Sequence, residues 1–351
     1  MNNNLQFSSV NTKISSMKSK TLQENDYINI MNLSNVMEVL DYLNDNTVYQ
    51  EVLWDLKGKE VHRNDIESRL YRFRELIIEK LILYIGNEYK DFLKKYLLRY
   101  EIEDLKLVFK IVRGKINPEY MDNYIFTTSK YSNIDFSELL EQSSVLDVLK
   151  KLKTTKYYRL IKPYSENISE KFNFYLEMVL DRYYYNELIE AVQRLPKTDD
   201  EKAAEILRRK IDLYNLEWIY RATKHFDMSK EEILNFVLGH GFKYDYKKLK
   251  KIIYSFDPDN PLKNFAGTQY EFIFNHDYDI DLFMERRIDR YIYYKALNLY
   301  KSSILTFGKT ISFIELIEFE IKDIFSIVES KRYHMSANEI SKYLIRTIEV
   351  N

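Results

Sequence analysis

A short pattern, a threonine two positions before a tyrosine, occurs three times in the chain at nearly equal intervals, and this repetition constrains the fold more than any other feature. The three copies are Thr47-Val48-Tyr49, Thr155-Lys156-Tyr157 and Thr268-Gln269-Tyr270. Each copy is followed by a helix-like segment that carries a carboxylate, and these carboxylates are Glu67, Asp181 and Glu285. We therefore expect three related units and not one irregular domain.

Each unit contains a second helix-like run that opens with an acid. In the first unit, offsets of 0, 3, 4, 7 and 8 give Glu101, Asp104, Leu105, Val108 and Phe109. The same offsets give Asp212, Asn215, Leu216, Ile219 and Tyr220, and then Glu320, Asp323, Ile324, Ile327 and Val328. These offsets fall on one helix face, polar for one turn and apolar afterwards.

An unpaired charge on an inward stripe is costly, so each opening acid should meet a partner. The sequence is compatible with two kinds of partner. One is an arginine or lysine of the neighbouring helix in the same unit, such as Arg69, Arg182 or Arg286. The other belongs to a second protein chain.

Composition favours a helical protein. Only 7 glycines and 5 prolines occur among 351 residues, which leaves little material for hairpins or long loops. Joints are expected near Asn117-Pro118 and between His225 and Ser229, where Ser229 and Glu232 form a helix-start pattern. The expected units are residues 1–116, 117–226 and 227–351. The two prolines within 257–261 predict a turn or loop.

Charge and cysteine content exclude several classes of protein. Lys plus Arg (53) nearly equals Asp plus Glu (54), so there is no basic field to attract nucleic acid. Zero cysteines exclude disulfides and thiolate metal sites. The N-terminus lacks the features of a signal peptide. The most apolar stretch, 76–85, is much shorter than the ~20 residues that span a bilayer, so we expect any membrane association to come through a partner.

The chain carries no recognisable catalytic motif. No glycine-rich phosphate loop is present, and Gly239-His240-Gly241 is expected to be a turn. The five histidines lack metal-ligand spacing, and the acidic segment 276–281 lacks the glycine and glutamate of a calcium loop, so it is expected to cap a helix. Three equivalent acids do not form an asymmetric acid and base pair. No catalytic, cofactor-binding or metal-ligating residue is therefore expected, and the chain is not expected to be an enzyme.

The closing helices resemble a known family. The segments LLRYEIEDLK (97–106), IDLYNLEWIYR (211–221) and EFEIKDI (318–324) are similar to the C subunit of bacterial and archaeal V-type/A-type ATPases, whose eukaryotic counterpart is the d subunit. The similarity extends over nearly the whole chain. Relatives are expected to have a basic residue six positions after the second polar residue, as Lys110 and Arg221 are here, whereas the third copy departs with Glu329.

This resemblance implies an all-α fold of three pseudo-threefold-related helical repeats that form a funnel around a central cavity. It also implies a non-catalytic subunit of the central stalk, or rotor. Such a subunit is a socket that joins D-type and F-type shaft subunits to the membrane c-ring, at the cytoplasmic face of the membrane. It would couple ATP hydrolysis or synthesis to proton or sodium transport and needs no cofactor.

Three lobes around one axis would each contribute an acid to the cavity, and such acids would repel one another unless a basic partner entered. We hypothesise that Glu67, Asp181 and Glu285, together with Glu101, Asp212 and Glu320, line or brace this cavity and bind a basic shaft. An alternative is an all-helical repeat scaffold that binds a soluble protein, and a weaker alternative is an α-helical enzyme.

Overall fold

The computed structural model describes residues 3–59, 61, 63–114, 130–165, 171–226, 228–274 and 280–349. Every regular element in these ranges is a helix, which confirms the predicted all-α class. The extended contact that they contain is an isolated antiparallel bridge between His240 and Asp245. None of the helices in these ranges combines the length and the apolarity that crossing a membrane requires.

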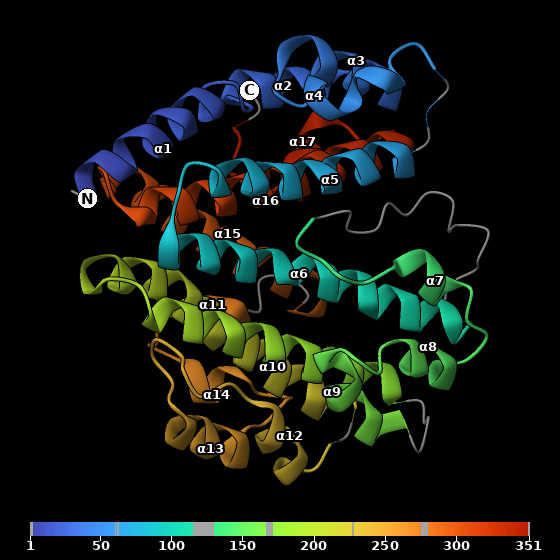
Figure 1. The fold of residues 1–351 in the computed structure, drawn as a ribbon, viewed down its shortest axis with the longest axis vertical. Helices are drawn as coiled ribbons and strands as arrows, with labels where there is room; N and C mark the ends of the chain where they lie inside the picture. The colour runs from blue at the N-terminus through green and yellow to red at the C-terminus, as the bar shows by residue number, and fades with distance from the viewer. Residues whose placement is uncertain are drawn as a thin grey trace.

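Three pairs of long helices form the body of the molecule (Figure 1). The pairs are α5 (Arg63–Ile82) with α6 (Asn87–Val112), α10 (Phe172–Gln193) with α11 (Lys197–Lys224), and α15 (Ile280–Ser302) with α16 (Phe307–Arg332). Within each pair a short turn joins two antiparallel helices. The pairs also pack on one another, because α10 contacts α6, α16 contacts α5, and α11 contacts both α15 and α16.

Helix α16 lies at the centre of this packing. It touches α1, α3, α5, α11, α15 and α17, and most of its side chains are buried around its whole circumference. A helix that is apolar on all sides can be stable only when it is surrounded. Its sequence FGKTISFIELIEFEI fits that position except for the glutamates, which require partners.

Short helices cover the outside of the long pairs. At one end of the molecule lie α1 (Asn3–Lys18), α2 (Glu24–Asn32), α3 (Val36–Asn46), α4 (Gln50–Leu53) and the 3₁₀ turn η1 (Trp54–Leu56), shown in blue in Figure 1. Beside α6 and α10 lie α7 (Phe136–Leu140), α8 (Val145–Lys151) and α9 (Lys156–Ser165). The remaining ones are α12 (Lys230–Phe236), α13 (Tyr246–Ser255), α14 (Leu262–Phe265), η3 (Glu271–Phe274) and α17 (Ala337–Ser341).

Local sequence signals set several of these boundaries. The predicted helix start at Ser229 is confirmed, since Ser229 and Glu232 form a reciprocal capping box at the start of α12. The proline segment 257–261 is a turn, as predicted. The joint predicted at Asn117-Pro118 lies outside the described residues, as does most of the acidic segment 276–281.

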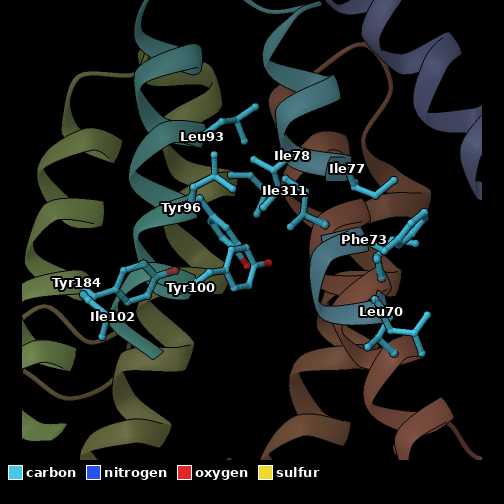
Figure 2. Close-up of a cluster of buried hydrophobic side chains, with 14 of the residues drawn as sticks. Leu70, Phe73, Ile77, Ile78, Leu93, Tyr96, Tyr100, Ile102, Tyr184 and Ile311 are labelled. Carbon is cyan, nitrogen blue, oxygen red and sulfur yellow. The ribbon is translucent and has the colours of Figure 1, made fainter. Parts of the chain in front are cut away.

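The core joins helices that are far apart in the sequence. Figure 2 shows Leu70, Phe73 and Ile77 of α5 beside α16, with Tyr96 and Tyr100 of α6 directed into the same interior. All five side chains are buried. Tyr96 and Tyr100 are amphipathic, so they need hydrogen-bond acceptors there. Those acceptors are the glutamates of α16.

Candidate partner-binding cavity

The tyrosine of each repeated Thr-x-Tyr pattern binds the opening acid of a long helix. The Tyr157 hydroxyl donates to Glu101. The Tyr270 hydroxyl donates to Asp212 Oδ2 at 2.8 Å, and the Tyr49 hydroxyl donates to Glu320 Oε1 at 2.8 Å. Each tyrosine therefore binds the acid of the preceding predicted unit. Tyr49, near the start of the chain, binds the acid of the last unit, so these contacts form a closed cycle.

The expectation that Arg69, Arg182 or Arg286 would pair with these acids is wrong. Arg69 pairs with Asp55, Arg182 donates to the carbonyl of Asn235, and the Arg286 guanidinium lies over the ring of Phe283. A tyrosine hydroxyl serves better at a buried site because it satisfies a carboxylate without bringing a second charge out of water.

Asp212 makes further hydrogen bonds to the backbone of a neighbouring turn. Besides Tyr270, its carboxylate accepts hydrogen bonds from the backbone amides of Lys243 at 2.6 Å and Tyr244 at 3.1 Å. The turn containing Gly241 wraps around this carboxylate. A Cβ at Gly241 would lie 2.0 Å from Asp212 Oδ1 and 2.7 Å from the Tyr244 carbonyl oxygen. The Gly239-His240-Gly241 segment is thus the predicted turn, and it surrounds a carboxylate.

Gly241→Ala is expected to lower the free energy of unfolding by about 1–3 kcal/mol, because the new methyl group overlaps both Asp212 and backbone. Chemical denaturation measures this change. Gly239→Ala is the matched control, since a Cβ there meets Tyr246 Cβ at an ordinary 3.9 Å. Equal effects of the two substitutions would contradict the proposed close approach at Gly241.

In the second and third copies, the polar residue one turn after the acid binds backbone beyond its helix. The Asn215 amide donates to the Leu238 carbonyl and accepts from the Leu238 amide, both at 2.8 Å. Asp323 accepts from the amides of Ile345 at 2.6 Å and Arg346 at 3.2 Å. Burial raises the pKa of Asp323 to about 7, although these amides oppose the shift. Glu320 also accepts from the Leu22 amide. Glu320 and Asp323 of α16 therefore bind segments near both ends of the chain.

A cavity of about 600 Å³ lies between the helix pairs. It is lined by α6, α10, α11, α15 and α16, and its walls are strongly charged. Eight carboxylates and five lysines or arginines line it; the acids are Glu103, Glu177, Asp181, Glu217, Glu285, Asp289, Glu315 and Glu318, and the bases are Arg99, Lys106, Lys210, Arg221 and Lys322. Carboxylates outnumber these bases, and Arg74 and Lys110 pair with Glu318 and Glu177 from outside the lining.

The cavity residues stand at fixed offsets from the repeated acids. Two positions before them are Arg99, Lys210 and Glu318, and two positions after them are Glu103, Tyr214 and Lys322, all of which line the cavity. Two positions turn an α-helix by about 200°. The opening acids therefore point away from the cavity and toward their tyrosines, although both faces of each helix are covered.

The cavity has an open mouth and a buried floor. The Glu285 side chain is 67% exposed, whereas that of Glu315 is 2% exposed. On α11, the lining residues from Lys210 to Arg221 span about 16 Å of helix. The mouth lies near the C-terminal end of α11 and the N-terminal end of α15, opposite the turns that connect the helices of each pair.

The floor is a network of buried charges. Glu318 pairs with Arg74 of α5 at 2.9 Å and accepts from the Tyr100 hydroxyl. Burial alone would raise the pKa of Glu318, but Arg74 and Arg99 outweigh burial and lower it to about 2. Glu315 pairs with Lys210 of α11 at 2.6 Å and accepts from Tyr96 of α6 at 2.6 Å. These contacts connect α16 to the other two helix pairs.

The mouth is less well neutralised. Lys322 pairs with Asp289 at 2.6 Å and lies 3.6 Å from Glu285, and Arg221 pairs with Glu217 at 3.0 Å. Burial raises the pKa of Glu217 to about 7; Arg221 opposes this shift, and repulsion from Glu285 and Asp289 adds to it. Burial also raises the pKa of Asp289, with Lys322 opposing.

Glu217→Gln is expected to raise the free energy of unfolding at pH 8 and to leave it nearly unchanged at pH 4. Between about pH 4.3 and 7 the unfolded chain releases this proton while the folded chain retains it, so stability falls as pH rises. Glutamine has no such proton to lose. Urea unfolding at both pH values measures the difference.

The control for Glu217 is Glu190→Gln, at an exposed glutamate 3.8 Å from Arg194. Glu190→Gln should change the free energy of unfolding by the same amount at pH 4 and at pH 8. A Glu217→Gln variant that is less stable than the wild type at pH 8 would contradict the assigned direction of the pKa shift.

The structure places the six predicted site residues in different surroundings. Asp181 and Glu285 line the cavity, where Asp181 pairs with Lys106. Burial raises the pKa of Asp181, and Lys106 opposes this shift. Glu67 pairs with Arg63, which it shares with Glu329, outside the cavity lining. Glu101, Asp212 and Glu320 bind the tyrosines. The role of all six residues in partner binding stays a prediction.

Sequence reasoning missed Glu217, Asp289, Lys322 and Trp218, which also line the cavity. An offset of two positions from the repeated acids gives Lys322, whereas Glu217, Trp218 and Asp289 do not stand at that offset. Of the basic positions, Arg221 lies in the lining, Lys110 pairs with Glu177 of the lining at 2.7 Å, and Glu329 pairs with Arg63. The part of the chain that the structure describes contains no group of His, Asp and Glu that could hold a metal ion.

Comparison with known proteins identifies the family. The family model described as ATP synthase (C/AC39) subunit matches residues 10–343. The C subunit of the A-type ATP synthase of Methanosarcina mazei is 25% identical over 319 residues, covering 88% of this chain and 83% of the relative. Its counterpart in Methanocaldococcus jannaschii is 23% identical over 320 residues, covering 88% and 75%. The chain therefore belongs to the family of C/AC39 subunits of V-type and A-type ATPases.

Proposed function

We propose that this chain is the non-catalytic socket of the central stalk in a rotary V-type/A-type ATPase. It connects D-type and F-type shaft subunits to the membrane c-ring at the cytoplasmic face of the membrane. Torque passes through it, so that ATP hydrolysis or synthesis is coupled to proton or sodium transport. Family membership supports a place in the rotary complex.

The observation that carries this proposal is the open, acidic cavity. Its carboxylates outnumber its lysines and arginines, and several of the acids are enclosed by helices on all sides. A basic helical shaft would neutralise this excess. A volume of about 600 Å³ is comparable with a small-molecule pocket, so the cavity takes the side chains at the tip of a shaft.

We further propose that the units 1–116, 117–226 and 227–351 form a funnel with approximate threefold symmetry. The tyrosine and acid contacts join the units in a closed cycle. Equivalent positions on α6, α11 and α16 line the same cavity. A closed arrangement suits a rotating part because no unit is left at a free end.

In this proposal the predicted site residues have two roles. Asp181 and Glu285 contact the shaft directly, while Glu67, Glu101, Asp212 and Glu320 brace the helices that surround it. Neutralising Glu67, Asp181 and Glu285 together, with Gln and Asn, is expected to weaken binding of a purified D-type shaft subunit by roughly tenfold. Calorimetry measures this change.

Replacing Glu101, Asp212 and Glu320 in the same way should lower the thermal unfolding temperature and, through it, shaft binding. If either triple variant binds the shaft as the wild type does, the assignment is wrong for that set. Copurification separates the socket from a soluble adaptor. A tagged chain should recover shaft and c-ring subunits from detergent-solubilised membranes, whereas an adaptor would recover neither.

A further inference from the structure

Helix α13 presents a row of lysines on its outer face. Lys247, Lys250 and Lys251 stand at offsets of 0, 3 and 4, which fall on one face of a helix. Tyr254 follows one turn later on the same face. All four residues are exposed, whereas Leu249 on the opposite face is buried. The row, together with the exposed neighbours Lys243 and Lys248, is the lysine face of the molecule.

The lysine face has no counterions within the protein. In the ranges that the structure describes, none of its five lysines forms an ion pair with a carboxylate. Asp245 is the one acid in the segment 243–251, and it caps α13 by accepting from the Lys248 amide at 2.8 Å. The unpaired lysines therefore produce a local positive potential.

The balance of charge in the whole chain does not reveal this face. Without the five lysines and Asp245, the totals of 53 Lys plus Arg and 54 Asp plus Glu become 48 and 53. The rest of the chain is therefore net acidic. Figure 1 places α13 at the opposite end of the longest axis from α3, which carries three acids and no lysine or arginine. The two ends of the molecule thus differ in charge.

The fold does not explain why so many lysines gather on α13. Helix α8, on the chain before the second Thr-x-Tyr pattern, also carries lysines, but Lys150 pairs with Asp147 at 2.8 Å and Lys151 with Glu138 at 2.6 Å. On α13 the neighbouring lysines lie one turn apart without such acids, and like charges at that spacing destabilise a helix. An anionic partner would remove this repulsion.

The chemistry of the lysine face favours a bilayer surface over an acidic protein segment. The segment 243–251 contains no arginine, the residue best suited to bidentate pairing with protein carboxylates. Tyr246 and Tyr254, which are 50% and 45% exposed, stand near the two ends of the row, and tyrosine is typical of membrane–water interfaces. Clusters of several lysines on an amphipathic helix are typical of binding to anionic lipids.

We infer that the lysine face of α13 binds the surface of an anionic phospholipid bilayer, with its ammonium groups against the lipid phosphates. The contact is peripheral, because Leu249 and Ile253 on the apolar side of α13 are buried in the protein. The acidic α3 lies far from this surface. The inference goes beyond the socket function, and it adds a direct contact to the expectation that membrane association comes through a partner.

Sedimentation of the purified chain with phospholipid vesicles tests this inference. The chain should bind vesicles of phosphatidylglycerol mixed with phosphatidylcholine and should not bind phosphatidylcholine alone. Raising the salt concentration should weaken the binding, because salt screens exposed charges. The triple variant Lys247→Gln/Lys250→Gln/Lys251→Gln should weaken binding to the mixed vesicles by about tenfold. These side chains are exposed, so the substitutions should leave the fold unchanged.

The matched control is Lys20→Gln/Lys301→Gln/Lys342→Gln, which changes the net charge equally at exposed lysines of other elements. It should bind the mixed vesicles as the wild type does. Equal losses in the two triple variants would overturn the inference, because net charge and not the lysine face would then determine binding. Failure of the wild type to bind the anionic vesicles would also overturn it and would favour an acidic protein partner.

Two further measurements separate this inference from its alternatives. Displacement of the chain from the vesicles by millimolar inorganic phosphate would overturn the inference, because a site for single anions would then explain the binding. The α13 triple variant should bind a purified D-type shaft subunit as the wild type does, since no residue of α13 lines the central cavity. A wild type that binds the vesicles but not the shaft would contradict the socket function alone.

Discussion

Arg74→Met is expected to lower the free energy of unfolding by about 3–5 kcal/mol, which is a large part of the stability of an ordinary domain. Arg74 lies between α5 and α16, with its side chain 9% exposed and 2.9 Å from Glu318. It also lies 3.6 Å from Glu103 and over the rings of Tyr71 and Tyr100. Removing this cation leaves a carboxylate buried without its charge partner.

The double variant Arg74→Met/Glu318→Gln is the control for this mechanism. Glutamine keeps an acceptor for the Tyr100 hydroxyl and carries no charge, so the double variant should recover most of the lost stability. If the double variant is instead as unstable as Arg74→Met alone, lost packing and not the stranded charge explains the effect. Urea unfolding at neutral pH measures all three proteins.

The pH dependence of this pair gives a further check. With its pKa lowered to about 2, Glu318 stabilises the folded chain above the ordinary glutamate pKa, and this contribution fades as pH falls toward 2. In Arg74→Met the buried carboxyl of Glu318 lacks the cation that lowers its pKa. The stability difference between the wild type and Arg74→Met should therefore narrow as pH falls below about 4.

The sequence was sufficient to predict the helical class and the elements of the repeat. Capping signals such as Ser229 with Glu232, and the scarcity of glycine and proline, depend on local chemistry that a sequence states directly. The repeated tyrosines and acids were both recognised. Their pairing was not, because Tyr270 and Asp212 are 58 residues apart and Tyr49 and Glu320 are 271 apart.

The cavity was harder to predict for a different reason. Periodicity identifies one inward face of a helix, but α16 is buried almost all round, so it has a second inward face. On that second face the side chains are charged, as in Glu315, Glu318 and Lys322, and in a sequence such residues look like a solvated surface. The burial of Glu315 and Glu318 depends on helices α5, α6 and α11, which belong to the other two helix pairs.

Asp212→Ala is expected to have a comparable effect to Arg74→Met, a loss of roughly 3 kcal/mol or more. The side chain accepts three hydrogen bonds, from two backbone amides and from Tyr270. Each buried donor left without an acceptor costs ~1–3 kcal/mol, and water reaches this fully buried residue poorly. Chemical denaturation of the isolated chain measures the loss.

Two milder substitutions separate the contributions of the individual hydrogen bonds that Asp212 accepts. Tyr270→Phe removes only the hydroxyl and should cost about 1 kcal/mol. Asp212→Asn keeps one acceptor oxygen but places an amide near the donors, so it should fall between Tyr270→Phe and Asp212→Ala. If Asp212→Ala were no worse than Tyr270→Phe, the turn 239–244 would not depend on the carboxylate, and the close approach of Gly241 would need another explanation. The predicted order follows because the backbone amides, unlike the tyrosine, cannot rotate toward another acceptor.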